Sequence, residues 1–281
     1  MSAGAATEAA DQYGVAGHPI AHSWSPFIHG MFAKATAQNL VYRLFDIPAE
    51  RFRRDALLLF ANGVKGLNVT VPHKQTAAEL VNELTPRAER ARAVNTIAFF
   101  EQTSLLGDNT DGVGLITDLE NNLGLALADK RVLILGAGGA VRGVLGALME
   151  RELREVVIAN RTPDRALKLA EEFSDLGKIS GCGFSAVHGP PYDLVVNATS
   201  ASLQGEMPVL PPGLVGEESL CYDMAYGRGD TPFTLWAKSV HAGRTAKGWG
   251  MLVEQAAESF SLWRGIRPDT APVLEALAPH A

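Results

Sequence analysis

The feature that most constrains this chain is a short apolar run, Val132 to Leu135, that ends in closely spaced glycines at Gly136, Gly138 and Gly139. A strand needs glycines at this spacing if it must turn sharply into a helix and let a pyrophosphate approach the backbone. The third position of the usual fingerprint, position 141, is valine rather than glycine or alanine. Glycine turns between strands and helices also occur without a ligand, so the run favours a dinucleotide site without establishing it.

The residues after the next predicted strand indicate which nucleotide such a site would take. An NAD enzyme places an acidic residue there for the ribose 2′-hydroxyl. This chain instead has Asn160, Arg161 and Thr162, with no carboxylate before Asp164. Arg161 and Arg165 are cations that suit a 2′-phosphate. The pattern therefore predicts NADP as the cofactor.

Length and composition exclude several classes of protein. With 281 residues, 47% of them hydrophobic and 20% charged, the chain resembles an ordinary soluble protein of about two domains. A net charge of −6 argues against a nucleic-acid partner and a membrane surface, and no apolar run approaches the ~20 residues of a membrane span. Cys182 and Cys221 show no paired spacing, which fits a reducing, cytoplasmic compartment. Residues 1–12 are expected to form a disordered tail rather than a signal peptide.

Short β-branched runs alternate with amphipathic segments, which predicts an α/β protein with parallel strands. The first half is expected to contain strands at 13–16, 41–46, 66–71, 96–100 and 104–106, and helices at 26–37, 48–62, 72–84, 86–92 and 111–122. The second half is expected to contain strands at 132–135, 156–159, 193–198 and 220–224, and helices at 164–173, 232–241 and 251–263. Residues 205–216 are expected to form a mobile surface loop.

Two serines, Ser23 and Ser25, precede the first predicted helix. A plain helix cap by Ser25 is the simpler interpretation, and the spacing alone favours it. Two hydroxyls beside the positive end of a helix can also bind a small carboxylate. The neighbouring His18, His22 and His29 lack the helical spacing of a metalloprotease motif, so no metal site is predicted.

Lys74 is expected in the first turn of the helix predicted at 72–84, where the helix dipole disfavours a cation. Stability alone would not select lysine there, whereas a proton-transferring amine benefits from surroundings that disfavour its charged form. A surface lysine that reaches solvent is the alternative. Asp111 ends a run of turn-forming residues, and either Thr110 or Asp111 could be a plain helix cap. The same carboxylate would also be well placed to contact a substrate.

The chemistry of hydride transfer favours pairing these two side chains. An alcohol must lose a proton as its C–H bond delivers hydride, so a second group besides the nicotinamide is required. The chain lacks thiolates for zinc, and no tyrosine is followed four residues later by lysine. Elimination favours a Lys74 and Asp111 pair, although a histidine remains open.

In their order and spacing, these motifs resemble the shikimate dehydrogenase family from about Tyr13 to the C-terminal helices. The resemblance rests on the runs at 22–26, 68–74, 93–96, 107–112, 136–140, 160–162, 197–200, 222–226 and 248–256. It implies an α/β fold of two domains with a cleft between them. One is a discontinuous substrate domain, residues 1–110 and 247–281, and the other is a Rossmann-type, doubly wound NADP-binding domain, residues 111–246.

The resemblance also implies an activity, the reversible NADPH-dependent reduction of 3-dehydroshikimate to shikimate in aromatic amino-acid biosynthesis. Lys74 would transfer the proton, with Asp111 as its partner. The substrate would be held by Ser23, Ser25, Thr70, Asn95, Tyr226 and Gln255. The cofactor would be held by Gly136, Ala137, Gly138, Gly139, Ala140, Asn160, Arg161, Thr162, Arg165, Thr199, Met224, Gly248 and Met251.

Three positions depart from the family pattern: Trp24 between the serines, Ser202, and Lys247, where aspartate is frequent. One alternative is a quinate/shikimate dehydrogenase that prefers NAD, which the two arginines oppose. Another is a non-catalytic NADP-binding sensor, which would not need Lys74, Asp111 or the serine pair. A folate dehydrogenase would have no evident use for serines that bind a carboxylate. The sequence does not distinguish a monomer from a homodimer.

Overall fold

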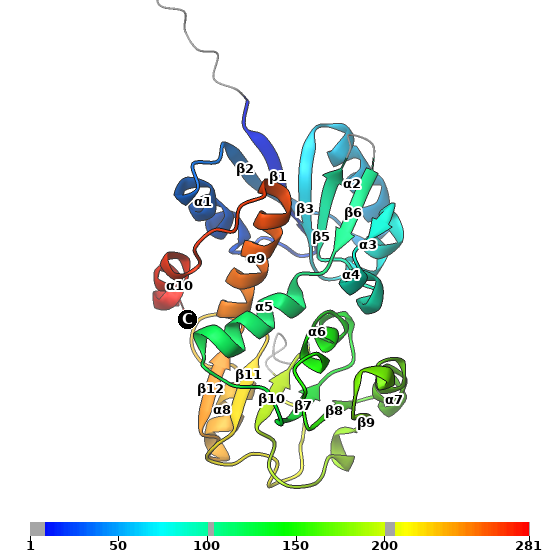
Figure 1. The fold of residues 1–281 in the computed structure, drawn as a ribbon, viewed down its shortest axis with the longest axis vertical. Helices are drawn as coiled ribbons and strands as arrows, with labels where there is room; N and C mark the ends of the chain where they lie inside the picture. The colour runs from blue at the N-terminus through cyan, green and yellow to red at the C-terminus, as the bar shows by residue number, and fades with distance from the viewer. Residues whose placement is uncertain (1–8, 101–103, 200–205, 281) are drawn as a thin grey trace, which may run out of the picture. The chain divides into compact units, whose positions relative to one another are not determined.

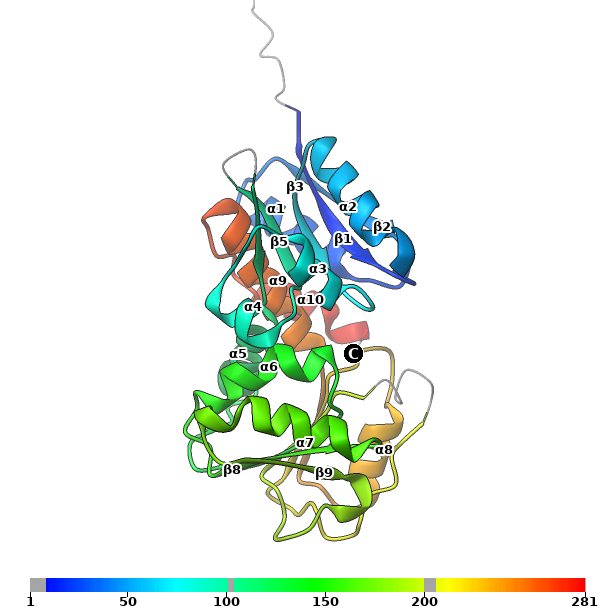
Figure 2. The ribbon, with the colours of Figure 1, turned by 90° about the vertical axis from the view of Figure 1, so that its right-hand side faces the viewer.

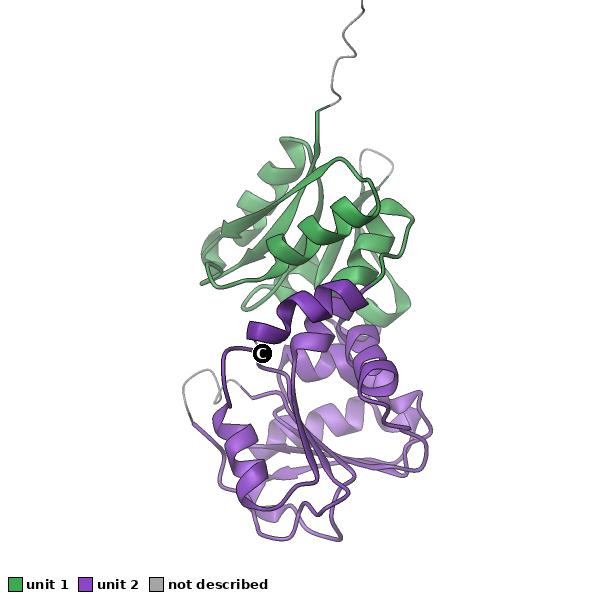
Figure 3. Cartoon of the chain, turned by 90° about the vertical axis from the view of Figure 1, so that its left-hand side faces the viewer, with its two compact units in different colours: residues 1–89, 93–109, 256–269 green, residues 90–92, 110–255, 270–281 purple. Residues whose placement is uncertain are grey.

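The computed structural model describes residues 9–100, 104–199 and 206–280, and it divides into two compact α/β units (Figure 1, Figure 3). The first unit comprises residues up to 89 with 93–109 and 256–269, and the second comprises 90–92, 110–255 and 270 onward. The prediction of two α/β domains is confirmed. Both units are discontinuous along the chain, because residues 256–269 return to the first and residues 90–92 and 270 onward belong to the second. The functional boundaries expected at 110/111 and 246/247 stay a prediction.

The first unit is built on a six-stranded mixed sheet with strand order β2-β1-β3-β5-β6-β4. Its strands are β1 (Asp11–Gly17), β2 (Leu40–Asp46), β3 (Val64–Val69), β4 (Glu83–Leu84), β5 (Thr96–Phe100) and β6 (Ser104–Asp108). Helices α1 (Ser25–Ala35), α2 (Phe52–Ala61), α3 (Lys74–Leu80) and α4 (Pro86–Ala91) connect them. Strands β1, β2 and β3 run parallel, whereas β5 is antiparallel to both β3 and β6.

Alternate side chains of β1 enter different cores, because successive residues of a strand point to opposite faces. Ala16 packs in the core that contains Phe52 and Phe60 of α2. Tyr13 and Val15 pack on the other face, in a cluster with Tyr42 of β2. Helix α9 (Trp249–Arg264) contributes to this second face through Trp263, so a segment late in the chain completes the first unit.

The second unit contains a fully parallel six-stranded sheet with order β9-β8-β7-β10-β11-β12. Its strands are β7 (Arg131–Leu135), β8 (Glu155–Asn160), β9 (Ile179–Gly183), β10 (Leu194–Asn197), β11 (Leu220–Asp223) and β12 (Arg244–Lys247). Counted from β7, this is the order 3-2-1-4-5-6 of a dinucleotide-binding Rossmann sheet. The order reverses between β7 and β10, so the predicted Rossmann-type fold is confirmed.

Both faces of this sheet are covered by apolar residues, which explains why β7 reads as a continuous apolar run. Helices α5 (Asp111–Thr117), α6 (Gly139–Met149) and α7 (Pro163–Glu172) pack on the face that includes Val132 and Ile134. Helix α8 (Pro232–Ser239) packs on the face that includes Leu133 and Leu135. Figure 2 shows α6 and α7 along one side of β8 and β9.

Several predicted elements need correction. Strands β4, β9 and β12 and the late helix α10 (Ala271–Leu277) were not predicted, and all three strands lie at sheet edges. An edge strand carries less continuous apolar sequence because solvent reaches it. The helix expected at 72–84 spans only Lys74–Leu80, and Asp11 and Gln12 belong to β1 rather than to a disordered tail. Residues 1–8 and Ser202 lie outside the described residues.

The expected loop at 205–216 carries no helix or strand in its described part, 206–216. Among the described residues, no helix combines the length and the apolar character needed to cross a membrane.

Candidate active site

The predicted substrate residues of the first unit all follow or precede one end of its sheet. Ser23 and Ser25 come after β1, and Thr70 and Lys74 come after β3, which is parallel to β1. Asn95 immediately precedes β5, whose start lies beside the end of β3 because these two strands are antiparallel. The sheet therefore places residues from three separate segments of the sequence at the same end of its strands.

The two serine hydroxyls are neighbours. Ser23 Oγ donates to Ser25 Oγ over 3.2 Å, and the backbone N–H of Ser25 donates to Ser23 Oγ over 3.3 Å. Ser25 is nearly buried, and the N-cap residue of α1 is Trp24, whose side chain caps nothing. The interpretation of Ser25 as a plain helix cap is therefore wrong. Its hydroxyl is left for the serine pair.

Lys74 begins α3 directly after a tight turn. The N–H of His73 donates to the carbonyl oxygen of Thr70 over 2.9 Å, and this turn delays the helix to Lys74. His73 is buried, stacks on Phe52 with ring centroids 4.4 Å apart, and bonds through Nε2 to the carbonyl of Ile47 at 2.6 Å. Burial lowers the pKa of His73, which keeps this anchor neutral. His73 therefore fixes the turn that presents Lys74, a role that the sequence did not indicate.

Asn95 is held in a buried polar network. Its side chain accepts a hydrogen bond from Thr96 Oγ1 over 2.9 Å. Asn68 lies at the centre of this network. Its side-chain oxygen accepts a hydrogen bond from the Tyr42 hydroxyl over 2.7 Å, and its amide nitrogen donates one to Ser259 Oγ over 3.0 Å. Buried polar groups that are satisfied in this way are rigid, so Asn95 has a defined orientation. Tyr42 in turn stacks on the fully buried ring of His29, whose pKa is lowered by desolvation to about 3.

An ion pair between the half-exposed Arg87 and the buried Asp108 holds the segment before Asp111. Asp108 is only 1% exposed, and both of its carboxylate oxygens accept hydrogen bonds from the Arg87 guanidinium. Thr85 Oγ1 also donates a hydrogen bond to this carboxylate, over 2.6 Å. The carboxylate also accepts the backbone N–H of Asn109 over 2.7 Å. Burial alone would raise the pKa of Asp108, but the hydrogen bonds from Arg87 and Thr85 outweigh it and hold the pKa below its ordinary value.

Asp111 and Gln255 belong to the second unit. Asp111 is 5% exposed and is the first residue of α5, after Thr110 at the N-cap position. The hydroxyl of Thr110 is not a helix cap, and it donates to Gln255 Oε1 over 3.4 Å. Helix α5 approaches α9 so closely at Gly114 that an added Cβ would lie 2.7 Å from the Cβ of Gln255. Residues predicted for catalysis and for substrate binding are thus linked within this unit.

The glycine turn lies where the strand order of the second sheet reverses. Gly136 follows β7 with φ of +111°, a conformation that side chains rarely adopt, and an added Cβ would lie 3.1 Å from the carbonyl oxygen of Ala198. Ala198 in turn follows β10 and donates to Leu135 over 2.9 Å. Ligands of such sheets bind outside the carboxyl ends of the strands at this reversal. Glycine at 136 is therefore required by the fold of the turn.

The start of α6 has the room and the donors that a pyrophosphate requires. Cβ atoms built on Gly138 and Gly139 would meet nothing within 4 Å, and no side chain caps the helix at Gly138. Uncapped N–H groups at a helix N-terminus attract anions. After β8, Arg161 and Arg165 are exposed and form no ion pair within residues 9–100, 104–199 and 206–280. Two unpaired cations beyond the next strand fit a phosphate on the ribose, so the residues present fit NADP.

The ends of β10, β11 and β12 carry the remaining predicted cofactor residues. Thr199 donates through its hydroxyl to Asn197 Oδ1 over 2.8 Å, and Asn197 donates to Asp223 over 3.1 Å. The N–H of Met224 donates to the carbonyl of Asn197 over 2.9 Å, and Gly248 lies so near Met224 that a Cβ on it would be 2.3 Å from the carbonyl oxygen. The structure thus brings these residues together. Asn197, for which the sequence indicated no specific role, hydrogen-bonds with both Thr199 and Met224.

Asp118 links three elements of this site and was not predicted. It lies in a π-helical turn, Asp118–Asn122, that continues α5. Its carboxylate accepts Tyr222 from β11 over 2.6 Å and the N–H of Met251 from α9 over 3.1 Å. A Cβ on Gly250 would lie 1.8 Å from this carboxylate, so only glycine fits there. Burial raises the pKa of Asp118 despite these hydrogen bonds.

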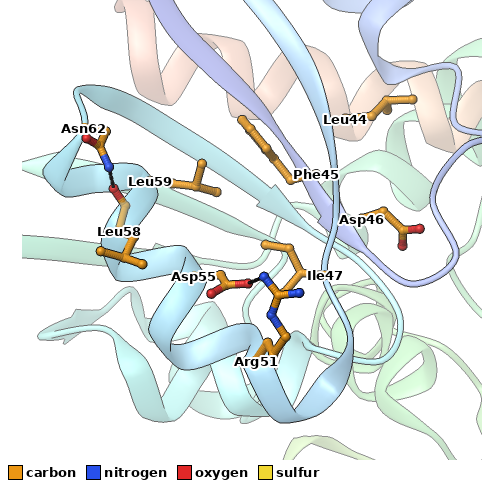
Figure 4. A pocket seen from close by; sticks show the side chains of 9 residues that line it. All are labelled: Leu44, Phe45, Asp46, Ile47, Arg51, Asp55, Leu58, Leu59 and Asn62. Atoms are coloured by element: carbon orange, nitrogen blue, oxygen red, sulfur yellow. Dashed lines mark hydrogen bonds and ion pairs between the residues drawn. The ribbon is translucent and has the colours of Figure 1, made fainter.

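A pocket with a volume of about 430 Å³ lies elsewhere in the first unit, between β2 and α2 (Figure 4). Its apolar wall includes Phe45, Ile47 and Leu59, and Arg51 and Asp55 form an ion pair of 2.8 Å at its side. None of the predicted site residues lines it. The pocket therefore gives no support to a second location for the chemistry.

Comparison with known families agrees with both halves of this description. Residues 15–97 match the family described as "Shikimate dehydrogenase substrate binding domain". Residues 118–204 match "Shikimate / quinate 5-dehydrogenase", and residues 248–278 match "Shikimate 5'-dehydrogenase C-terminal domain".

Curated relatives and solved structures extend the likeness over nearly the whole chain. The "Shikimate dehydrogenase (NADP(+))" of Alkalilimnicola ehrlichii is 54% identical over 96% of this chain and 99% of its own. That of Methylococcus capsulatus is 51% identical over 95% and 96%. The Ael1 enzyme of Pseudomonas putida has a TM-score of 0.89 at 45% identity, covering 95% of this chain and 98% of its own. A Thermus thermophilus shikimate 5-dehydrogenase, solved with NADP(H) and shikimate, has a TM-score of 0.84 at 35% identity, covering 96% and 99%.

Proposed function

Because this chain belongs to the shikimate dehydrogenase family, we propose that it reduces 3-dehydroshikimate to shikimate with NADPH, reversibly, as a step of aromatic amino-acid biosynthesis. It is an NADP-dependent oxidoreductase. The observation that carries the proposal is the placement of the candidate residues. The four substrate residues of the first unit lie in the segments that follow β1 and β3 or precede β5, and most of the nucleotide residues lie in the segments that follow β7, β8, β10, β11 and β12.

Substrate binding is assigned first to the serine pair. Ser23 and Ser25 offer two neighbouring hydroxyls, and hydroxyl donors near a helix start can hold a carboxylate. Thr70 and Asn95 are assigned to the ring of the substrate, the latter with its amide oriented by Thr96. Tyr226 and Gln255 are assigned to the substrate as well. The substrate domain in this proposal comprises residues 1–110 and 247–281.

Proton transfer is assigned to Lys74 and orientation of the reacting hydroxyl to Asp111. A ketone that becomes an alcohol must gain a proton on its oxygen, and an ammonium group is a suitable donor. Lys74 follows a turn that His73 anchors, so the backbone from which the Lys74 side chain extends is held in place before substrate binds. Asp111 is a nearly buried carboxylate at the start of α5. Bound NADPH supplies the hydride.

The cofactor is assigned to the carboxyl ends of the strands of the second sheet. Residues 136–140 would hold the pyrophosphate through backbone N–H groups, and Arg161 and Arg165 would hold the 2′-phosphate. Asn160 directly precedes Arg161, and Thr162 lies between the two arginines in the sequence. Asn160 Nδ2 donates to the carbonyl of Thr162 over 3.0 Å, which shapes this short segment. Thr199, Met224, Gly248 and Met251 are assigned to the nicotinamide, against which a flexible thioether packs well.

The test of the activity follows NADPH formation by the absorbance of the reduced nicotinamide, with shikimate or quinate as substrate and NADP or NAD as acceptor. Turnover with shikimate and NADP is expected. Turnover confined to quinate and NAD would reject the proposal in favour of a quinate enzyme, and binding of NADP without any turnover would favour the sensor.

The role of Lys74 is tested by Lys74→Ala. Turnover should fall by roughly 10²- to 10⁴-fold, the usual contribution of a general acid or base, while binding of shikimate and NADP measured by calorimetry persists. A fully active Lys74→Ala enzyme would contradict the assignment. We also propose that the protein is cytoplasmic and that it is a monomer or a homodimer. Sedimentation of the purified chain distinguishes the monomer from the homodimer.

A further inference from the structure

Lys247, the position where the family often has aspartate, is the last residue of β12 and pairs in register with Asp223 of β11. Its ammonium group is half-buried and donates to two backbone carbonyls, Gly227 at 3.0 Å and Gly229 at 2.6 Å. Desolvation lowers the pKa of Lys247. Both carbonyls lie in residues 224–231, the connection between β11 and α8, which we term the Tyr226 loop.

The two ends of the Tyr226 loop are held by other groups. At its start, the N–H of Ala225 donates to Asp223 over 3.1 Å. At its end, the hydroxyl of Thr231 donates to the same carboxylate over 2.6 Å, and Asp230 forms an ion pair with Lys238 at 2.7 Å. Neither set of contacts reaches residues 227–229. Within the described residues, Lys247 is the side chain that bonds the middle of the loop.

The middle of the Tyr226 loop needs such a restraint because of its sequence. Gly227 and Gly229 flank the exposed Arg228, and Gly229 has φ of +68°. Glycines leave a backbone free to adopt many conformations, so ordering them costs more entropy than ordering other residues. Tyr226, immediately before this pair, packs its ring on Trp249 with centroids 5.1 Å apart. Movement of the two glycines would carry Tyr226 with it.

We propose that Lys247 is a positioning residue for Tyr226: its hydrogen bonds to Gly227 and Gly229 fix the Tyr226 loop so that the tyrosine is ready for the substrate. The inference rests on the proposed function, through the assignment of Tyr226 to the substrate. An aspartate at 247 could not serve in this way, because a carboxylate accepts hydrogen bonds but has none to donate to a carbonyl. Arginine could, since it carries several donors.

The first test reads the Tyr226 loop without substrate or cofactor. Trypsin cleavage after Arg228 should be about tenfold faster in Lys247→Met than in the parent protein, the effect of losing about 1.4 kcal/mol of restraint from two hydrogen bonds. Lys247→Arg should restore slow cleavage. The matched control is Lys178→Met, which removes an exposed lysine paired with Glu155 at the opposite end of the same sheet and should leave the rate unchanged. Equal rates in the parent and Lys247→Met would overturn the proposal.

The second test asks whether Lys247 acts through Tyr226. In Lys247→Met the KM for shikimate should rise about five- to tenfold, with kcat and the KM for NADP changed less than about twofold. In a Tyr226→Phe background the same substitution should change the KM for shikimate by less than about twofold, because coupled residues are not additive. Additive effects would overturn the positioning role. A parent enzyme inactive on shikimate would reject the proposed function, while the trypsin result would still decide whether Lys247 restrains the loop.

Discussion

Replacement of Arg161 by alanine should change the choice of nucleotide without changing the fold. The guanidinium is exposed after β8 and forms no ion pair in the part of the chain that the structure describes, so its removal breaks no ion pair there. Whatever is lost is therefore lost from the complex with NADP. NAD has no 2′-phosphate, so its affinity should change by less than about twofold.

The expected magnitude follows from the exposure of the side chain. Opposite charges about 4 Å apart attract by about 1 kcal/mol in water and by about 4 kcal/mol near a protein surface. A charge-assisted hydrogen bond contributes about 1.5–3 kcal/mol. For an exposed guanidinium we expect about 1.5–2.5 kcal/mol, which corresponds to a roughly 10- to 70-fold loss of NADP affinity. Loss of Arg165 as well should weaken NADP further.

The assay compares dissociation constants for NADP and NAD by calorimetry at low and high salt. The Debye length falls from about 8 Å at physiological ionic strength to about 3 Å at 1 M, so salt should weaken NADP binding more in the parent than in Arg161→Ala. Arg154→Ala is the matched control, because this exposed arginine pairs with Asp129 just before the start of the same strand, β8. An equal loss for both nucleotides, or no loss for NADP, would refute the reasoning.

Three further predictions concern buried polar groups. Asp118→Asn removes an acid whose pKa is raised in the folded protein; such an acid makes folding less favourable as pH rises above about 4. Urea unfolding at several pH values should therefore show the parent losing stability relative to Asp118→Asn as pH rises, and a constant difference would contradict this. The pKa of Asp108 is lowered instead, so its ion pair stabilises the fold above about pH 4 and the benefit disappears in acid. Arg87→Met should cost about 2–3 kcal/mol at pH 7 and progressively less as the pH falls below about 4, and a cost that does not change with pH would speak against the ion pair. Ser25→Ala should change the free energy of unfolding by less than about 1 kcal/mol. It should raise the KM for shikimate at least about tenfold and leave the KM for NADP unchanged. An unaltered KM for shikimate would contradict the assignment of the serine pair to the substrate.

The elements that sequence predicted well are those whose local pattern is strong. Strands β7, β8, β10 and β11 are central in their sheet and carry apolar runs because both of their faces are buried. The edge strands β9 and β12 escaped prediction because they are only partly buried and include glycine or charged residues. The start of α3 was misplaced by two residues, since a turn at Thr70 to His73 cannot be told from a first helical turn by composition.

What the sequence by itself determined was the set of chemical groups available to a site: a glycine turn followed by two arginines, a serine pair, a lysine and a carboxylate. These signals are local, because each depends on residues that are neighbours along the chain. Only the tertiary structure decided which groups hold them in place. Asp118 meets Tyr222 from 104 positions away, and Lys247 bonds carbonyls 18 and 20 positions before it. Such contacts depend on how strands and helices pack, and no periodicity or spacing in the chain encodes them.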